Sequence, residues 1–397
     1  MPGTLVCDIL VVGAGPAGST AAAAAAREGA ETVMIDAKVR IGEQPHCGEF
    51  VPERLFSEMG LERTAIIQKV DFMETRVIAA GIGSTSARHC SSKVAGTCSS
   101  NQLNIRYVEK SEYKKSEIPS PGFLIDRVRF DRDLAREAAA QGVTVFCSTR
   151  LVHAEEGAWL VKHGSEMMIL RPKFTIACDG ASSTVAASLK LKPPVVLRGL
   201  QVEAPLVEPI NKTLVFLSRN FAGGYGWVFP KGKAANIGIG ALPGKSTHMG
   251  KTLNQFLGML CRERLIRPGT LARSGGLIPV SGIRERLVLD TVVFCGDAAG
   301  LTHPITGAGI PQAVFSGDLA GRATAAALRT GDGCYLREYE AEIEARYRGV
   351  MDHALSKRAL MTNCWNDPDF EAVCEETWIG FKGYRRRVAN AGARSLP

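Results

Sequence analysis

The segment that most constrains the fold is the run Gly-Ala-Gly-Pro-Ala-Gly at residues 13–18, near the start of the chain. An apolar run precedes it at residues 7–12, and an alanine-rich run follows it at residues 17–26. This order of strand, glycine-rich turn and helix is the dinucleotide-binding fingerprint of a Rossmann-type fold. The candidate cofactor-binding residues of this unit are Gly13, Ala14, Gly15, Pro16, Ala17, Gly18 and Asp36.

Each of these residue types has a physical reason to stand where it does. The first glycine permits a tight turn, the second lets the backbone approach a pyrophosphate, and the third allows the helix to pack closely. Asp36 ends the second predicted strand, where its carboxylate can accept the hydroxyls of a ribose. This unit alone does not distinguish FAD from NAD, and a tight turn without any ligand is the plainer alternative.

The uncharged stretch at residues 9–26 could also be a signal peptide or a membrane span. However, Asp8 precedes it, no Lys or Arg does, and a Gly-Pro pair interrupts its centre. A strand, a turn and a helix explain it better. Hydrophobic residues make up 45% of the chain and charged residues 22%, which is typical of a soluble globular protein.

Two later motifs select the cofactor. Apolar residues 174–178 lead into Asp179-Gly180, and a predicted strand at residues 287–295 leads into Gly296-Asp297. In this order the motifs resemble those of the flavoprotein hydroxylase superfamily. The resemblance implies that Asp297 binds the ribityl chain of FAD and that the amides of Gly309 and Ile310 meet the isoalloxazine ring. A helix cap is the alternative role for Asp297.

The segment around Arg127 also matches this superfamily. It precedes a helix predicted at residues 130–141, and the resemblance implies that Arg127, rather than Arg129, approaches the FAD phosphates. A surface salt bridge is the alternative. By the same resemblance, the backbone of Leu151 at the end of the next strand contacts the adenine.

Three further features resemble the geranylgeranyl reductase family. Gly300 stands where the hydroxylases usually carry histidine, and Cys47-Gly48 follows the first unit. Tyr225, Trp227 and Phe229 then form a Tyr-x-Trp-x-Phe-Pro motif, which differs from the related Trp-x-Trp-x-Ile-Pro segment of flavin halogenases. The resemblance spans about residues 7–350.

The resemblance implies an FAD-dependent reductase that saturates isolated C=C bonds of a geranylgeranyl or other prenyl chain. A proton would be added to one alkene carbon, and reduced flavin would deliver hydride to the developing tertiary cation. Cys47 is the candidate catalytic residue, as proton donor or as an organiser of water, and a small packing residue is its plainer interpretation. His46 and His303 are weaker candidates for the acid and are expected to be hydrogen-bonded loop residues.

Tyr225, Trp227 and Phe229 share one face of a predicted strand and are the candidate substrate-binding residues. Alternating aromatic residues can equally be plain core. The main alternative activity is an FAD-dependent monooxygenase or oxidase acting on an aromatic or polyketide-like substrate. A non-catalytic flavoprotein that carries lipid or electrons is a third alternative.

The fold class expected is α/β: a Rossmann-type FAD-binding domain with an inserted α+β substrate domain built on an antiparallel sheet, plus a helical C-terminal region. The FAD-binding domain is predicted at residues 1–75, 122–190 and 285–330. The substrate domain is predicted at residues 76–121 and 191–284, and the helical region at 331–397. The Ser- and Cys-rich insertion at residues 88–104 fits no family pattern.

No second intact dinucleotide fingerprint is found, so NAD(P)H visiting the same face or a ferredoxin is the expected electron donor. The formal charge of +8 is compatible with an acidic ferredoxin, whereas nucleic acid is not an expected partner. The tail from Trp378, with Phe381, Tyr384 and arginines 385–387, suits either a peripheral membrane contact or a disordered basic end. Cysteine spacing predicts neither disulfides nor a metal site, and the expected location is cytoplasmic or peripheral on the inner face of the membrane.

Overall fold

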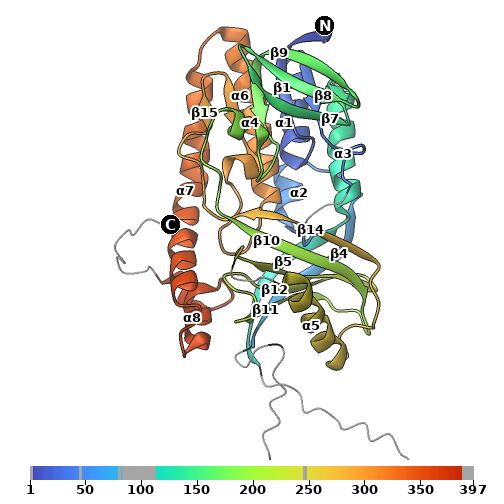
Figure 1. Ribbon diagram of the computed structural model, residues 1–397, viewed down its shortest axis with the longest axis vertical. Helices are drawn as coiled ribbons and strands as arrows, with labels where there is room; N and C mark the ends of the chain where they lie inside the picture. The colour runs from blue at the N-terminus through green and yellow to red at the C-terminus, as the bar shows by residue number, and fades with distance from the viewer. Residues whose placement is uncertain (1–2, 44–46, 79–81, 83–112, 245–247, 387–397) are drawn as a thin grey trace, which may run out of the picture.

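Two large sheets organise the computed structural model, which describes residues 3–43, 47–78, 82, 113–244 and 248–386. The first sheet carries the glycine-rich turn, and the second lies at the opposite end of the molecule (Figure 1). The long helix α7 (Cys334–Asn363) runs along one side of the molecule, past the first sheet and toward the second (Figure 1). The mixed α/β architecture agrees with the expected fold class.

The first sheet has the strand order β15-β16-β9-β1-β2-β6, with a ribbon of β7 and β8 continuing from β9. Neighbours from β16 to β6 pair in parallel, and Ile9, Leu10 and Val11 in the central strand are completely buried. A continuous apolar run is what a parallel strand covered on both faces requires. The strands are β1 (Gly3–Val12), β2 (Thr32–Ile35), β6 (Thr144–Phe146), β7 (Thr149–Glu155), β8 (Ala158–His163), β9 (Glu166–Ala177), β15 (Val288–Leu289) and β16 (Val292–Phe294).

Helices α1 (Pro16–Arg27) and α6 (Ile310–Thr330) pack against each other through small residues. A Cβ atom added to Gly317 would lie 2.2 Å from the carbonyl oxygen of Ala17, and one added to Gly321 would lie 2.2 Å from that of Ala21. The alanine-rich run therefore serves a close helix contact, and the strand–turn–helix interpretation of residues 9–26 is confirmed. Helices α3 (Arg127–Ala140) and α4 (Thr184–Ser188) complete this half.

The second sheet has the order β14-β10-β13-β12-β11-β4-β5-β3. It is antiparallel as expected, except that β11 and β4 pair in parallel. A parallel pair needs a long crossover, and the chain between these two strands passes through the first sheet. The strands are β3 (Phe50–Pro52), β4 (Ile66–Ile78), β5 (Lys114–Ile125), β10 (Val196–Pro205), β11 (Lys212–Ser218), β12 (Gly226–Lys231), β13 (Ala234–Ala241) and β14 (Ala272–Pro279).

The expected domain boundaries at residues 75/76 and 121/122 fall inside β4 and β5. Both strands lie in the second sheet throughout, together with β3. The short helix α2 (Arg54–Glu58) follows β3, and α5 (Met249–Arg262) packs on β13 and β10. The second sheet thus begins near residue 50, because β3 pairs with the end of β5 rather than with the first sheet.

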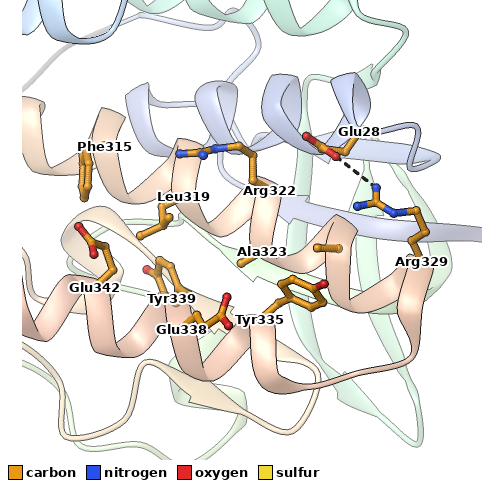
Figure 2. Close-up of a pocket in the computed structure, with 11 residues that line it drawn as sticks. Glu28, Phe315, Leu319, Arg322, Ala323, Arg329, Tyr335, Glu338, Tyr339 and Glu342 are labelled. Carbon is orange, nitrogen blue, oxygen red and sulfur yellow. Dashed lines mark hydrogen bonds and ion pairs between the residues drawn. The ribbon is translucent and has the colours of Figure 1, made fainter.

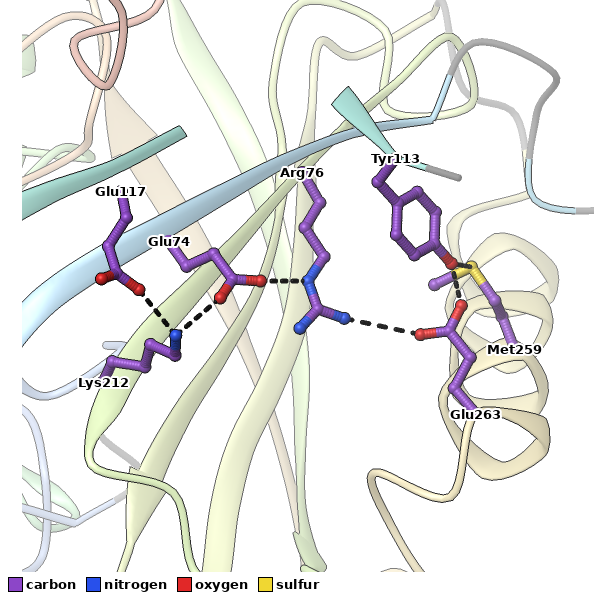
Figure 3. A network of polar contacts seen from close by, with 7 residues as sticks. All are labelled: Glu74, Arg76, Tyr113, Glu117, Lys212, Met259 and Glu263. Carbon is purple, nitrogen blue, oxygen red and sulfur yellow. Dashed lines mark hydrogen bonds and ion pairs between the residues drawn. The ribbon is translucent and has the colours of Figure 1, made fainter. Parts of the chain in front are cut away.

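A chain of alternating charges connects β4, β5 and β11 to the residue that follows α5 (Figure 3). The Lys212 ammonium lies 2.6 Å from Glu117 and 2.7 Å from Glu74. Arg76 lies 2.6 Å from Glu74 and 3.6 Å from Glu263. The pKa of Glu74 is lowered: burial opposes its ionisation, but the two cations outweigh burial. The network ties the parallel strand pair to the helix that covers it.

The segment predicted as one strand at residues 287–295 is instead a short hairpin of β15 and β16. The chain reverses at Asp290, whose φ of 50° lies in the left-handed region that aspartate tolerates better than most residues. The correction leaves Gly296 at the carboxyl end of a parallel strand, as expected.

The described part of the C-terminal tail is folded against the second sheet, so it is not a disordered basic end up to residue 386. After α7 come α8 (Phe370–Thr377) and the short 3-10 helix η2 (Lys382–Arg385). Trp378 and Tyr384 are buried, and the Trp378 indole donates to the Thr75 hydroxyl at 3.0 Å. Arg387 and the 88–104 insertion lie outside the described residues. Among the helices that can be described, none is long and apolar enough to cross a membrane.

Candidate active site

The turn between β1 and α1 cannot accept side chains at its first and last glycines. Gly13 has φ of 99°, and a Cβ atom there would lie 2.4 Å from the carbonyl oxygen of Cys178. A Cβ atom on Gly18 would lie 1.7 Å from the carbonyl oxygen of Gly13. By contrast, a Cβ atom on Gly15 would meet nothing within 4 Å. The middle glycine therefore faces open space, as the approach of a pyrophosphate to the backbone requires.

The N-terminus of α1, which is the positive end of the helix dipole, faces the open space at Gly15. Gly15 is the N-cap, no side chain caps the helix, and Pro16 begins it. The amides of the first turn are thus free for an anion. Asp36 is held beside the turn, because its Oδ2 accepts from the Ala14 amide and its Oδ1 accepts from the Lys38 amide, each at 2.8 Å.

Asp179 lies where β9 ends, next to the glycine-rich turn. Its Oδ2 accepts from the Val185 amide at 3.1 Å, whereas its Oδ1 is buried without a hydrogen-bond partner. Burial raises the pKa of this carboxyl, against the hydrogen bonds of Ser183 and Val185. Gly180 follows with φ of 79°. A buried polar atom without a partner costs free energy, so this oxygen is suited to meet a ligand.

Asp297 and the start of α6 form the other end of the cofactor site. Asp297 lies in the short 3-10 helix η1 (Gly296–Ala299), and its Oδ1 accepts from the Thr302 hydroxyl at 2.5 Å. Burial raises its pKa, whereas Thr302 and Arg127 lower it. Gly309 is the N-cap of α6, and a Cβ atom there would come within 3.1 Å of the same Oδ1. The carboxylate and the helix N-terminus therefore lie side by side.

Gly300 has a structural reason to differ from the histidine of the hydroxylases. Its φ is 75°, and a Cβ atom there would lie 2.1 Å from the carbonyl oxygen of Gly282. A histidine at this position would require the chain around residue 282 to move. The glycine that distinguishes the two families in the sequence is therefore required here, because the backbone of residue 282 leaves no room for a side chain.

The structure places Arg127 and Arg129 in different surroundings. Arg127 is largely buried and forms a bidentate pair with Asp131, at 2.9 and 3.0 Å. Arg129 is exposed and lies 3.7 Å from Asp133. Its own backbone amide binds the N-cap Asp126. Leu151 lies inside β7, paired with β8, rather than at the end of a strand, and its side chain is buried in the core.

The residues present fit FAD. They provide a turn without side chains, an uncapped helix N-terminus, Asp36 beside the turn and an unpartnered Asp179 oxygen near the same turn. The second carboxylate, Asp297, stands at another helix N-terminus. Phosphates, ribose and polyol hydroxyls each have a complementary group among these residues.

Cys47 is fixed from several directions. Its Sγ accepts from the Glu49 amide at 3.2 Å, and its carbonyl oxygen accepts from Gln201 Nε2 at 2.9 Å. Burial raises the pKa of the Cys47 thiol, and the nearby Arg127 guanidinium only partly opposes this. The group is therefore a thiol near neutral pH.

The three aromatic residues of the Tyr-x-Trp-x-Phe motif face this cysteine loop. The Phe229 ring lies so close to Gly48 that a Cβ atom there would be 2.6 Å from it. Trp227 donates from its indole to Gln201 Oε1 at 3.2 Å and packs over Gly238, where a Cβ atom would lie 2.3 Å from the ring. Tyr225 contacts Trp227 edge-on, with ring centroids 5.7 Å apart.

Two residues of this assembly were not predicted. Gln201 of β10 bridges the Trp227 indole and the Cys47 carbonyl, and the Trp378 ring lies tilted against Tyr225, with ring centroids 4.9 Å apart. Nothing in the sequence around Gln201 distinguishes it from other polar residues on a strand. Trp378 could have been noticed as one of only four tryptophans in the chain.

His303 is a hydrogen-bonded loop residue, as expected, and its ring is neutral near neutral pH. Its Nδ1 accepts from the amides of Ile305 and Thr306 at 3.3 and 3.2 Å. Burial, with a smaller contribution from His353, lowers the pKa of His303 to about 4. His46 lies outside the described residues.

A separate hollow of about 560 Å³ lies between α6, α7 and the end of α1 (Figure 2). Its lining mixes aromatic residues such as Phe315 and Tyr339 with the exposed ion pair of Glu28 and Arg329. None of the predicted site residues lines it. It is therefore distinct from the candidate active site.

Comparison with known proteins decides the family. The model of an FAD-binding domain matches residues 6–196, and the model of the geranylgeranyl reductase catalytic domain matches residues 202–268. A digeranylgeranylglycerophospholipid reductase of Methanocaldococcus jannaschii is 31% identical over 93% of this chain and 90% of its own. The chain belongs to the geranylgeranyl reductase family.

The structural neighbours agree with this assignment. A geranylgeranyl bacteriochlorophyll reductase-like protein of Thermoplasma acidophilum is 25% identical, with a TM-score of 0.76, over 96% of this chain and 92% of its own. A flavin-dependent brominase superposes with a TM-score of 0.67 at 15% identity, over 94% and 91% of the two chains, and shows only a shared fold. The prediction of an FAD-dependent reductase is confirmed and is favoured over the monooxygenase alternative.

Proposed function

We propose that this enzyme saturates the isolated C=C bonds of geranylgeranyl chains on a glycerophospholipid, with Cys47 as the proton donor. The observation that carries the proposal is that a single side chain, Gln201, connects the cysteine to the aromatic strand. Gln201 binds the Cys47 carbonyl with its amide nitrogen and the Trp227 indole with its amide oxygen. The relatives named digeranylgeranylglycerophospholipid reductase support the substrate class.

FAD, when bound and reduced, supplies the hydride. The residues proposed to hold it are Gly13, Ala14, Gly15, Pro16, Ala17, Gly18, Asp36, Cys47, Gly48, Arg127, Leu151, Asp179, Asp297, Gly309 and Ile310. The free amides at the start of α1 would bind the phosphates. The start of α6 would place the positive end of a helix dipole beside the ring.

Cys47 would hold the proton that one alkene carbon needs. An isolated alkene has no carbonyl to accept electron density, so positive charge develops on the more substituted carbon as the proton arrives. The raised pKa of Cys47 keeps the proton on Sγ until the substrate is in place. The faces of Tyr225, Trp227 and Phe229 would bind the apolar chain and stabilise the positive charge.

The electron donor and the access route are further proposals. NAD(P)H or a ferredoxin would reduce the flavin, and the net charge of +8 favours an acidic protein donor. Because a prenyl lipid resides in a bilayer, we also propose a peripheral membrane contact. Trp378 and Tyr384 do not provide it, since both are buried.

The decisive experiment is anaerobic single-turnover reduction. FAD-loaded protein is reduced with dithionite and mixed with a digeranylgeranyl glycerophospholipid, and the lipid is then analysed by mass spectrometry. We expect the mass to rise by two hydrogens for each bond reduced, without oxygen. Cys47→Ala should lower the rate by about 10²-fold while FAD remains bound. A product that forms only in air and contains an added oxygen would overturn the proposal in favour of a monooxygenase.

A further inference from the structure

Glu49 is unusual in two ways at once. Its φ is 69°, in the left-handed region that residues other than glycine rarely adopt, and its side chain is buried. Strained backbone of this kind persists only where the surroundings hold it in place. Residue 49 also donates the hydrogen bond that reaches the Cys47 thiol, at 3.2 Å.

The second sheet supplies the groups that hold Glu49. Its Oε2 accepts from Asn236 Nδ2 at 2.7 Å and lies 2.6 Å from the Lys231 ammonium. Its carbonyl oxygen accepts from the Ile125 amide at 2.9 Å. Hydrogen bonds that involve an ionised group are stronger than neutral ones, and the Glu49 side chain that accepts these is buried. Together they can offset the strain at residue 49.

The neighbours of Glu49 are fixed by the same sheet. Phe229 of β12 leaves no room for a side chain on Gly48, and Gln201 of β10 holds the Cys47 carbonyl. Strands β10, β12 and β13 thus each contribute a side chain to residues 47–49. The strand that carries the aromatic residues also carries Lys231.

We propose that Glu49 is a positioning residue: its carboxylate, clamped by Asn236 and Lys231, keeps the residue 49 backbone strained so that its amide stays on Cys47 Sγ. The inference rests on the proposed function of Cys47, and it assigns the control of that thiol to an ion pair in the second sheet. Loss of the clamp would let the loop relax and would expose the thiol.

Other groups also act on the Cys47 thiol. Arg127 of α3 favours the thiolate, the negative charge of Glu49 disfavours it, and Tyr225 lies close enough for its charge to couple with that of Cys47. Removing the Glu49 charge alone therefore favours the thiolate slightly. Releasing the loop is a different effect, because it changes access to the sulfur.

The test measures the alkylation rate of Cys47 by iodoacetamide in full-length FAD-loaded protein, by mass spectrometry of the peptide that contains Cys47. Glu49→Ala removes the clamp, and Asn236→Ala removes one partner of it. Glu49→Gln keeps an oxygen that can accept from Asn236. Glu203→Gln is the matched control, because Glu203 lies 3.7 Å from the same lysine but forms no hydrogen bond or ion pair with residues 47–49, the described part of the loop.

We expect Glu49→Ala to raise the alkylation rate at neutral pH roughly tenfold or more, and Asn236→Ala to raise it several-fold. Glu49→Gln should stay within about threefold of the unchanged protein and move the pH profile to lower pH, because one negative charge is gone. Glu203→Gln should leave the rate within about twofold.

Unchanged alkylation in both alanine variants would overturn the proposal, and Asn236→Ala decides it alone if Glu49→Ala does not fold. Equal acceleration by Glu49→Gln and Glu49→Ala would also overturn it, since charge and not position would then be the cause. The readout needs no lipid. A protein that shows these rates but reduces no prenyl chain would refute the proposed function of Cys47, whereas the effect of Glu49 on access to the thiol would stand.

Discussion

Two sets of glycines, one in each half of this molecule, serve different purposes. In the FAD-binding half, Gly13, Gly18 and Gly300 bring one backbone against another, with carbonyl oxygens where a Cβ atom would lie. In the half with the second sheet, Gly48 and Gly238 make room for aromatic rings. The first arrangement fixes the path of the chain, whereas the second fixes side chains. Substitutions in the two halves should therefore fail in different ways.

The largest effect is expected from Gly18→Ala. The new Cβ atom would lie 1.7 Å from the Gly13 carbonyl oxygen, and only a movement of the turn itself can relieve this overlap. We expect FAD affinity to fall by at least about 10²-fold, roughly 3 kcal/mol. Flavin absorbance of the purified protein checks this. Gly250→Ala is the control, because a Cβ atom there meets nothing within 4 Å. A Gly18→Ala protein that keeps its bound flavin would contradict the role given to the glycines of the FAD-binding half.

Gly238→Ala should instead leave FAD in place. A Cβ atom at this position would lie 2.3 Å from the Trp227 ring and 2.6 Å from the Gln201 side chain. Overpacking of this kind costs about 1–3 kcal/mol, and displacement of the ring should also slow prenyl reduction. Flavin content and urea unfolding are compared with those of Gly199→Ala, where the nearest atom is 3.5 Å away. If Gly238→Ala loses flavin and Gly199→Ala does not, packing in the second sheet also controls FAD binding.

The third prediction concerns His303, in the loop between η1 and α6. Its pKa falls from the ordinary 6.5 to about 4 in the folded protein, because burial disfavours the charged ring. As pH drops from 6.5 toward 4, His303 is protonated in the unfolded chain but stays neutral in the folded chain. The free energy of unfolding therefore falls over that pH range. At pH 5 the loss should be about 2 kcal/mol.

His303→Asn should remove this dependence while an amide oxygen replaces Nδ1 as the acceptor of the Ile305 and Thr306 amides. The stability advantage of the unchanged protein over the variant should therefore shrink between pH 7.5 and pH 5, by about 2 kcal/mol in urea unfolding. An advantage that stays constant with pH would show that His303 takes up its proton normally when folded.

The smallest effect is expected from Arg127→Lys. A lysine cannot form the bidentate pair with Asp131, and its charge sits in a different place. We expect FAD affinity to weaken by about tenfold, or 1.4 kcal/mol. Arg129→Lys is the control, since that side chain is exposed. If titration of FAD into the two apo variants gives the same affinity, Arg127 has only a structural role.

The cofactor motifs could be predicted because their geometry is local. Residues 13–15 form the turn, residues 16–18 begin α1, and Asp36 directly follows the next strand, so spacing along the chain translates directly into position. The hairpin at Asp290 was missed because two short apolar strands separated by a single tight turn look like one run of hydrophobic residues. Leu151 was placed at a strand end for a similar reason, since strand boundaries depend on pairing with β8.

The environment of Cys47 could not be predicted in the same way. Gln201, Lys231 and Asn236 come from three strands of an antiparallel sheet, and only the register of those strands brings their side chains to residues 47–49. Polar residues on strands are common, and nothing marks these three in advance. The positive φ of Glu49 likewise depends on the groups around it rather than on the residue type.

By itself, the sequence determined a dinucleotide-binding Rossmann-type fold, since backbone approach and helix polarity follow from residue types at short spacing. The later motifs, through their resemblance to a known superfamily, indicated that the dinucleotide is FAD. The aromatic motif and Gly300 indicated the family. Only the tertiary structure decided how Cys47 is held, why Gly300 excludes histidine and where the C-terminal tail lies. These depend on contacts between segments far apart in the chain, where packing and strand register, not local preference, set the geometry.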